Sequence, residues 1–220
     1  KGRKVFSGVV SESSYISIPS ADVCWQETEK IIEGDYCVYV ENCFHKPPDV
    51  GLLEIENNNI NLESFEENIC RAFDLIEREL GLKVIIAASG KYVYPDSEIF
   101  GKREIIYYKL NQLIQHSELV IGHFSQGLLQ AFVNYKPIMI LYDTSFAPSL
   151  IKLTKSVGAA LSLQPIAISS LNNSHLNNLS VNKNNYDQVL ETYINDSGLE
   201  LDSKVIITNS IRSIFLKARH

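Results

Sequence analysis

The sequence lacks any long apolar run. A membrane-spanning helix needs roughly 18 or more consecutive apolar residues, and the longest candidate stretch, residues 118–142, is interrupted by His123, Gln126, Gln130, Asn134 and Lys136. Positive charge is also scarce, because 20 Lys and Arg stand against 26 Asp and Glu, for a net charge of -6. A broad DNA- or RNA-binding face requires the opposite balance. We therefore expect no transmembrane segment and no nucleic-acid partner.

Cysteine is sparse and shows no pairing pattern. No CxxC motif joins the four cysteines, which are Cys24, Cys37, Cys43 and Cys70. Metal-ligand spacing is equally missing among His45, His116 and His123. We interpret the cysteines as free thiols of a reducing compartment. The sequence thus predicts a cytoplasmic protein without a metal site, whose association with the inner membrane would depend on a partner or on a missing segment.

Three enzyme signatures are absent. They are the GxGxxG of dinucleotide-binding proteins, the GxxxxGK[ST] of P-loop enzymes and the GxSxG of α/β-hydrolases. Each of these motifs places a backbone segment or a nucleophile that the chemistry of its class requires. The sequence therefore disfavours all three classes.

What the sequence does contain is an alternation of strand-like and helix-like segments. Apolar runs typical of strands buried on both faces occupy residues 35–40, 83–88, 119–122 and 137–142, with a shorter one at 166–168. Helical patterns occupy residues 64–80, 104–116, 125–135 and 148–157, and two more close the chain at 186–196 and 203–218. The alternation predicts an α/β fold, a Rossmann-like doubly wound parallel sheet with C-terminal helices. We assign this domain to residues 35–220, and we interpret residues 1–34 as an extension or a linker from a preceding domain.

In an open parallel sheet, ligands bind beyond the carboxyl ends of the strands. One such loop, residues 122–127, joins a strand directly to a helix, whose N-terminal N–H groups attract anions such as phosphate. Ser125 and Gln126 add hydrogen-bonding side chains, and Gly127 permits close approach of the backbone. The alternative is that Ser125 only caps the helix and that Gly127 only packs.

Two further strand-end loops carry candidate groups. Residues 89–103 hold Lys91 and Arg103 together with tyrosines, a combination that suits the phosphates and the base of a nucleotide. Residues 41–49 hold Glu41, His45 and Asp49, where a carboxylate could bind a sugar hydroxyl or act as a base. The alternatives are a solvated loop in the first case and a plain turn in the second.

Three segments resemble GT-B-type glycosyltransferases of bacterial capsule, lipopolysaccharide and O-antigen synthesis. The similarity is to the users of CMP-activated sugars, namely Kdo transferases and, more distantly, sialyltransferases. The segments are YCVYVENCFHKPPDV (36–50), KVIIAASGKYVYPDSEIFGKREI (83–105) and, most specific, HSELVIGHFSQGLLQAFVNYKPIMIL (116–141). The resemblance covers about half the chain. It implies that the chain is a nucleotide-binding domain, one half of a GT-B fold.

The resemblance and the loop analysis together nominate a set of site residues. Those expected to bind the donor are Ser89, Lys91, Arg103, His123, Ser125, Gln126 and Gly127, and those expected to act in catalysis are Glu41, His45 and Asp49. No cofactor is implied beyond a nucleotide-sugar donor, CMP-linked by resemblance. The implied partners are that donor, a glycan acceptor and a missing N-terminal Rossmann domain or partner enzyme. The chain opens with Lys1, as an excised piece of a longer enzyme would.

Two departures from the family pattern keep other functions open. Ser89 and Gly90 stand where the family has His-Pro, and Pro47-Pro48-Asp49 stands where it has His-Pro-Asp. A histidine that stabilises a leaving phosphate cannot be exchanged for Ser or Gly without losing charge-assisted hydrogen bonds. The alternative function is therefore a non-enzymatic binding or scaffolding relative of the same fold. An epimerase-like enzyme is the third possibility.

Overall fold

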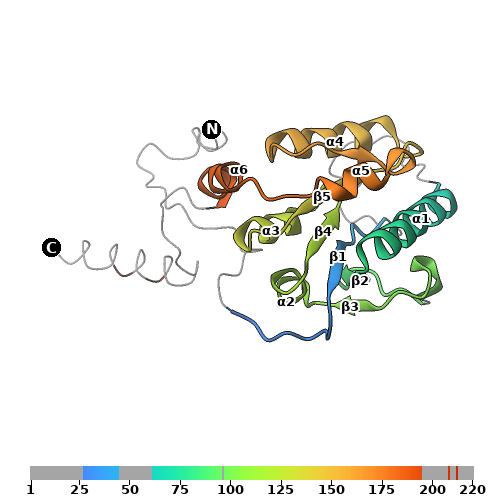
Figure 1. Ribbon diagram of the computed structural model, residues 1–220, viewed down its shortest axis with the longest axis horizontal. Coiled ribbons are helices and arrows are strands. Elements are labelled where there is room, and N and C mark those ends of the chain that lie inside the picture. The colour runs from blue at the N-terminus through green and yellow to red at the C-terminus, as the bar shows by residue number, and fades with distance from the viewer. Residues whose placement is uncertain (1–26, 45–60, 96, 195–207, 209–211, 213–220) are drawn as a thin grey trace.

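The protein folds around a six-stranded parallel sheet with the order β3-β2-β1-β4-β5-β6 (Figure 1). The computed structural model describes residues 27–44, 61–95, 97–194, 208 and 212. The strands are β1 (Tyr36–Val40), β2 (Lys83–Ala88), β3 (Ile105–Tyr107), β4 (Leu119–Gly122), β5 (Ile138–Tyr142) and β6 (Ile166–Ala167). Every neighbouring pair is parallel. This strand order is that of the doubly wound Rossmann-like sheet, so the predicted fold class is confirmed.

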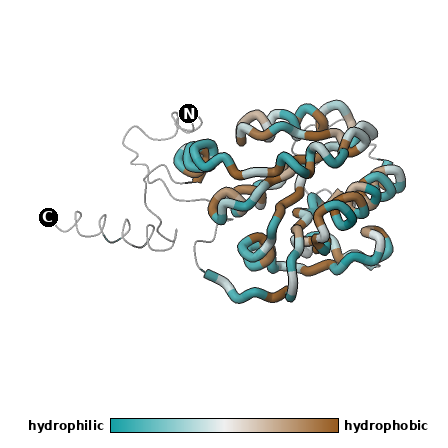
Figure 2. Tube along the Cα trace, in the orientation of Figure 1, coloured by the Kyte–Doolittle hydropathy of each residue, from teal (hydrophilic) through white to brown (hydrophobic). Residues whose placement is uncertain are grey.

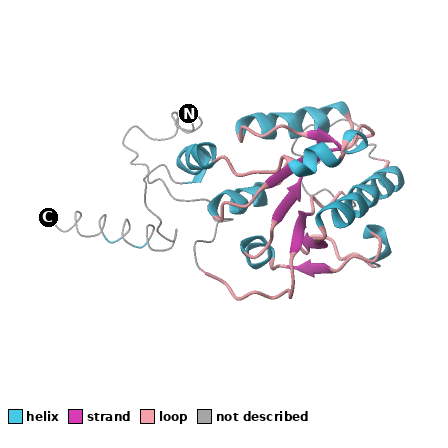
Figure 3. Ribbon diagram, viewed as in Figure 1, coloured by secondary structure: helices cyan, strands magenta, loops and turns pink. Residues whose placement is uncertain are grey.

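Helices cover both faces of the sheet (Figure 3). The α-helices are α1 (Leu62–Leu80), α2 (Leu110–Gln115), α3 (Leu129–Val133), α4 (Pro148–Ala160), α5 (Asn173–Asn177) and α6 (Lys183–Val189). Single turns of 3-10 or π geometry are η2 (Ser97–Phe100), η3 (Gln126–Leu128), η4 (Ile168–Ser170) and η5 (Leu190–Ile194). Among the described residues, no helix combines the length and the apolar character needed to cross a lipid bilayer.

The core lies in two layers, one on each side of the sheet. Alternate residues of β1 point to opposite layers: Cys37 and Tyr39 pack with α1, whereas Val38 packs with α2 and α3. Both layers are buried, which explains why the strands read as uninterrupted apolar runs. Figure 2 shows hydrophobic residues concentrated along the inner strands, with polar residues on outward surfaces such as that of α6.

Helix α1 forms where its sequence pattern places it. The Asn61 side chain accepts a hydrogen bond of 3.1 Å from the Ser64 N–H at the N-terminus, and Gly81 ends the helix with a φ of 68°, a left-handed conformation that favours glycine. The buried face consists of Phe65, Ile69, Ala72, Phe73 and Ile76. Full burial of each large apolar side chain contributes about 1.5–3 kcal/mol, so this face holds the helix against the sheet.

The helix expected over residues 104–116 is confirmed only in its second half, as α2, and is wrong in its first half. Residues 105–107 form β3, which pairs with β2 through Ile86–Ile105 and Ala88–Tyr107, and only then does α2 begin. Two isoleucines and a tyrosine favour a strand, and the free edge of β2 supplies the hydrogen-bonding partner. This correction moves the strand ends that define the candidate site.

The segment before β1 packs on the domain in its described part. Ile32 is buried in the layer that contains α2 and α3. The Thr28 N–H donates to the Gln115 side chain over 2.7 Å, and the Thr28 carbonyl accepts from His116 Nε2 over 2.7 Å. At the other terminus, α6 and η5 occupy most of the expected helix 186–196, whereas almost all of the helix expected over 203–218 lies outside the described residues.

Candidate nucleotide-binding site

The strand order fixes where a ligand crevice lies. It reverses between β1 and β4, and the chain leaves these two strands toward opposite faces, to α1 and to η3–α3. In open parallel sheets, ligands bind outside the carboxyl ends of the strands at such a reversal. The loops described at this edge follow β1, β2, β3, β4 and β5.

Three of these loops contact one another. The Tyr108 N–H donates to the Ala88 carbonyl over 3.1 Å, and the Tyr108 hydroxyl donates to the Gly90 carbonyl over 3.5 Å. A Cβ placed on Gly90 would lie 2.1 Å from the Tyr108 ring, and one on Gly127 would lie 2.6 Å from Leu110 Cδ2. The turns that follow β2, β3 and β4 are therefore in contact, and the two glycines permit that contact.

Tyr108 is the most exposed of these residues and the most strained. The residue is 76% exposed, and its φ is 59°, a left-handed conformation that is uncommon for an aromatic residue. Residues with such strained backbone conformations cluster at functional sites. The ring lies against Gly90 and presents itself to solvent at the carboxyl edge. Tyr108 was not among the residues nominated from the sequence, although the run Ile105-Ile106-Tyr107 could have placed it after a strand.

Two lysines flank this tyrosine. Lys91 follows β2 and Lys109 follows β3, and both side chains are exposed. Within the described part of the chain, neither ammonium group forms an ion pair. The nearby Ser89 is exposed, and its hydroxyl accepts from the Lys91 N–H over 3.3 Å. The edge therefore offers two available cations beside an exposed aromatic ring.

The turn after β4 has the capped form that the sequence analysis left as its alternative. The Ser125 hydroxyl accepts from the Gly127 N–H over 3.2 Å, which leaves its O–H free to donate. Gly127 is buried against Leu110 and Val40, so it packs. Gln126 is exposed. The helix that follows is shorter than expected, since η3 spans three residues and α3 five. Because so short a helix has only a weak dipole, Ser125 and Gln126 contribute to the edge mainly through their side chains.

Two carboxylates at this edge are buried and already hydrogen-bonded. Glu41 is 7% exposed and accepts from the Cys43 N–H. Burial, together with the neighbouring Glu41 carboxylate, raises the pKa of Tyr94. Asp143, directly after β5, accepts from the Asn68 side chain over 3.0 Å and from the Ser145 N–H over 2.7 Å. Neither carboxylate faces solvent as a free base would. The other residues nominated for catalysis, His45 and Asp49, lie outside the described residues.

His123 lies beneath the edge, where it cannot contact a bound phosphate. Its side chain is fully buried, and its Nδ1 contacts the Leu141 carbonyl over 2.6 Å. The rings of Phe44, Phe65 and Phe146 lie 5.2, 5.7 and 5.7 Å from the imidazole, centroid to centroid. Burial lowers the pKa of His123 to about 4. The imidazole is therefore neutral near pH 7, in contrast to the donor-binding role expected from the sequence.

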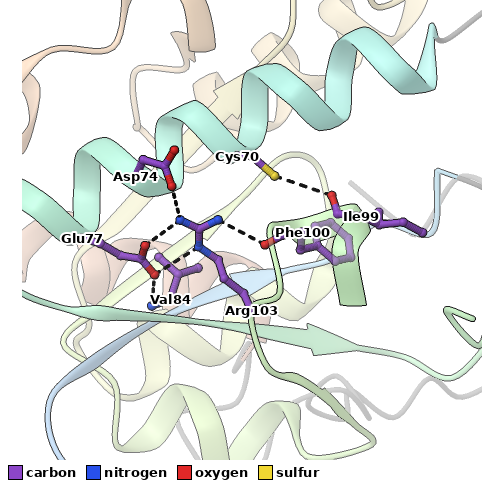
Figure 4. Close-up of polar contacts among 7 residues, drawn as sticks. All are labelled: Cys70, Asp74, Glu77, Val84, Ile99, Phe100 and Arg103. Atoms are coloured by element: carbon purple, nitrogen blue, oxygen red, sulfur yellow. Dashed lines mark hydrogen bonds and ion pairs between the residues drawn. The ribbon is translucent and has the colours of Figure 1, made fainter. Parts of the chain in front are cut away.

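Arg103 lies at the opposite edge of the sheet. The chain crosses back between Ala88 and Ile105, so Arg103 precedes β3 and sits at its amino end. Its guanidinium donates to Glu77 over 2.6 and 3.1 Å and to Asp74 over 2.6 Å (Figure 4). It also donates to the Phe100 carbonyl over 3.1 Å. With its side chain 8% exposed, Arg103 ties α1 to the η2–β3 turn, so the structure does not bring it to the candidate site.

The sheet and its loops define a Rossmann-like α/β domain with a candidate nucleotide site made of Ser89, Lys91, Tyr108, Lys109, Ser125 and Gln126. Within the described residues, no group of three His, Cys, Asp or Glu side chains is placed to hold a metal ion. No family model matches the sequence, and no curated protein matches it.

Similar folds occur among solved glycosyltransferases. The glycosyltransferase SnogD from Streptomyces nogalater is 12% identical, with a TM-score of 0.47 over 82% of this chain and 44% of that one. The kitacinnamycin glycotransferase is 11% identical, with a TM-score of 0.41 over 74% and 39%. The calicheamicin glycosyltransferase CalG4 is 14% identical, with a TM-score of 0.41 over 76% and 40%. The chain spans less than half the length of these proteins. Likeness at this level carries no argument about activity, so the fold class rests on the sheet itself.

Proposed function

We propose that the carboxyl edge of the sheet binds a nucleotide, and that the chain is the donor-binding half of a GT-B-type glycosyltransferase. The observation that carries the nucleotide site is the exposed ring of Tyr108, which lies against Gly90 on the turn that follows β2. An aromatic ring held in place suits stacking of a base, which typically contributes about 1–3 kcal/mol. Lys91 and Lys109 supply the charge that phosphate groups require, and Ser89, Ser125 and Gln126 supply neutral hydrogen-bonding groups.

Glycosyl transfer is supported by the resemblance of the three sequence segments. In such a reaction, negative charge develops on the leaving nucleotide phosphate, and preorganised cations lower the energy of that transition state. We assign this role to Lys91 and Lys109, which are both exposed. The CMP-activated donor and the role in bacterial surface-polysaccharide synthesis also follow from the resemblance. Since Glu41 is buried and bonded, we assign the catalytic role to His45, Asp49 or the second domain.

A titration of CMP, CDP, UDP and GDP against the whole chain, followed by thermal unfolding, tests the nucleotide site. A ligand at 100 times its dissociation constant stabilises the folded state by about 2.7 kcal/mol. We expect CMP to raise the melting temperature, and Lys91→Ala to reduce the shift. Lys102→Ala is the matched control, because Lys102 is exposed in the same connection but next to Arg103. Stabilisation by none of the nucleotides, or an equal loss in both variants, would contradict the proposal.

One observation favours the second function, a non-catalytic binding relative. Glu41, which was nominated for catalysis, and His123, which was nominated for donor binding, are both buried and hydrogen-bonded. Release of CMP from a CMP-sugar in the presence of glycan acceptors distinguishes the two functions. Nucleotide binding without acceptor-dependent release, even after a second Rossmann domain is supplied, supports the binding relative.

A further inference from the structure

His123 links three strands at the point where the backbone ladder ends. The β4–β5 ladder stops at Gly122–Ile140, and the β1–β4 ladder stops at Tyr39–Ile121. One residue beyond, the His123 side chain reaches the Leu141 carbonyl of β5 over 2.6 Å and the Tyr39 hydroxyl of β1 over 2.9 Å. The imidazole therefore continues the pairing on both sides of β4, where the chain turns away toward Ser125.

The hydrogen bonds fix the tautomer of His123. A carbonyl oxygen only accepts, so the proton lies on Nδ1 and is donated to Leu141. Nε2 is then an acceptor, and the Tyr39 hydroxyl donates to it. Both nitrogens are satisfied inside a cluster of aromatic rings, which avoids the cost of burying an unpaired polar group.

We infer that His123 is a positioning residue that holds the Ser125–Gly127 turn in register with β1 and β5. Only one residue, Phe124, separates it from Ser125, and within the turn Gly127 and Leu128 donate their N–H groups to the Ser125 hydroxyl and carbonyl. Fixing His123 from both sides thus fixes the base of the turn. The expected effect of His123 on ligand binding rests on the proposed nucleotide-binding function. Its expected effect on the Ser125–Gly127 turn does not depend on that function.

Three variants separate the two hydrogen bonds. His123→Asn retains a donor near the position of Nδ1 and loses the acceptor at Nε2. His123→Phe preserves a ring and loses both bonds. Tyr39→Phe removes only the hydroxyl donor, which makes it the mildest change and keeps the inference testable if His123→Phe does not fold. Ile76→Val, in α1 on the same side of the sheet and remote from the turn, is the matched control for general loss of stability.

The experiment is amide hydrogen exchange and nitrogen NMR on the whole chain, with and without CMP. We expect a neutral Nδ1–H tautomer, and exchange at Gly127 and Leu128 about tenfold faster in His123→Phe than in the control, as loss of a buried hydrogen bond implies. Tyr39→Phe should give a smaller increase, and His123→Asn should restore part of the protection. The affinity for CMP should fall in the same order.

Two results would overturn the inference: an Nε2–H tautomer, or exchange at Gly127 no faster than in a control of equal global stability. If the wild-type chain binds none of the nucleotides, the proposed function fails by itself. The exchange rates and the tautomer still decide the role of His123 in that case.

Discussion

Arg103 lies at one edge of the sheet and Lys91 and Lys109 lie at the other, and these cations differ in burial and in ion pairing. At the amino edge, Arg103 is 8% exposed and is held by Asp74 and Glu77 from α1. At the carboxyl edge, Lys91 and Lys109 are exposed and form no ion pair with any described residue. Arg103 and Lys91 belong to one connection between two strands. The comparison teaches that a cation stabilises the fold where a neighbouring helix supplies carboxylates to pair with it. Where no helix does so, the cation remains available to a ligand.

The largest expected effect is the loss of folding stability when acid protonates His123, which is buried beneath the carboxyl edge. The pKa of His123 is about 4 in the folded protein and about 6.5 when unfolded, so its stabilisation is complete above pH 6.5 and is lost as the pH falls from 6.5 to 4. The full loss is about 3 kcal/mol, at about 1.4 kcal/mol per pKa unit. The neighbouring Asp143 carboxylate opposes part of this lowering of the His123 pKa. Urea unfolding between pH 7 and 4 measures the loss, and a His123→Phe chain with the same slope would contradict it.

Removing the paired cation at the amino edge is the next largest effect. Arg103→Ala should lower the free energy of unfolding by about 2 kcal/mol, less than for a fully buried pair because Asp74 and Glu77 remain partly exposed. Denaturant unfolding measures this loss, and CMP binding should stay unchanged. The adjacent Lys102→Ala, on an exposed side chain, should change stability by less than about 0.5 kcal/mol. Equal losses in both variants would break the comparison between the edges.

Removing the exposed ring at the carboxyl edge should have the opposite effect, with weaker CMP binding and almost unchanged stability. Tyr108→Ala should weaken CMP binding about tenfold, as the loss of one stacked base implies. Its effect on stability should be small, because Tyr108 is 76% exposed and alanine at this position has the same left-handed backbone conformation as tyrosine. Calorimetric titration measures the affinity. Tyr135→Ala, at another exposed tyrosine with positive φ, is the control that should leave CMP affinity unchanged.

The smallest expected effect comes from a single unpaired cation. Lys91→Ala should weaken CMP binding a few-fold, and the loss should shrink as salt is raised from about 0.05 to 0.5 M, because salt screens exposed charges. Titrations at both salt concentrations measure it. A loss independent of salt would show that Lys91 acts through packing, which would remove the distinction from Arg103.

Most of the fold could be predicted from the sequence. Strands β1, β2, β4 and β5 are apolar runs buried on both faces, and α1 repeats its apolar residues at helical spacing. These local patterns predict the elements correctly because burial of the same apolar residues in the core stabilises each strand and helix. The short β3 was missed, since three residues of strand give no clear period and only the free edge of β2 decides them.

The candidate site was less predictable, for reasons that follow from tertiary contacts. Missing β3 placed Arg103 at the wrong edge and hid Tyr108 and Lys109. The burial of His123 depends on Phe44, Phe65 and Phe146, which come from three distant segments. No spacing in the sequence shows that these rings meet around it. Lys91 and the Ser125 turn were predicted because they immediately follow strands that were recognised.

Backbone NMR of the whole chain during titration with CMP tests the central claim most directly. The account predicts that the largest shift changes occur at Lys91, Tyr108, Lys109 and Gln126, on the three turns that meet at the carboxyl edge, while amides around Arg103 stay unchanged. Changes concentrated at the amino edge or on the outer surface of α4, or no changes at saturating CMP, would contradict it.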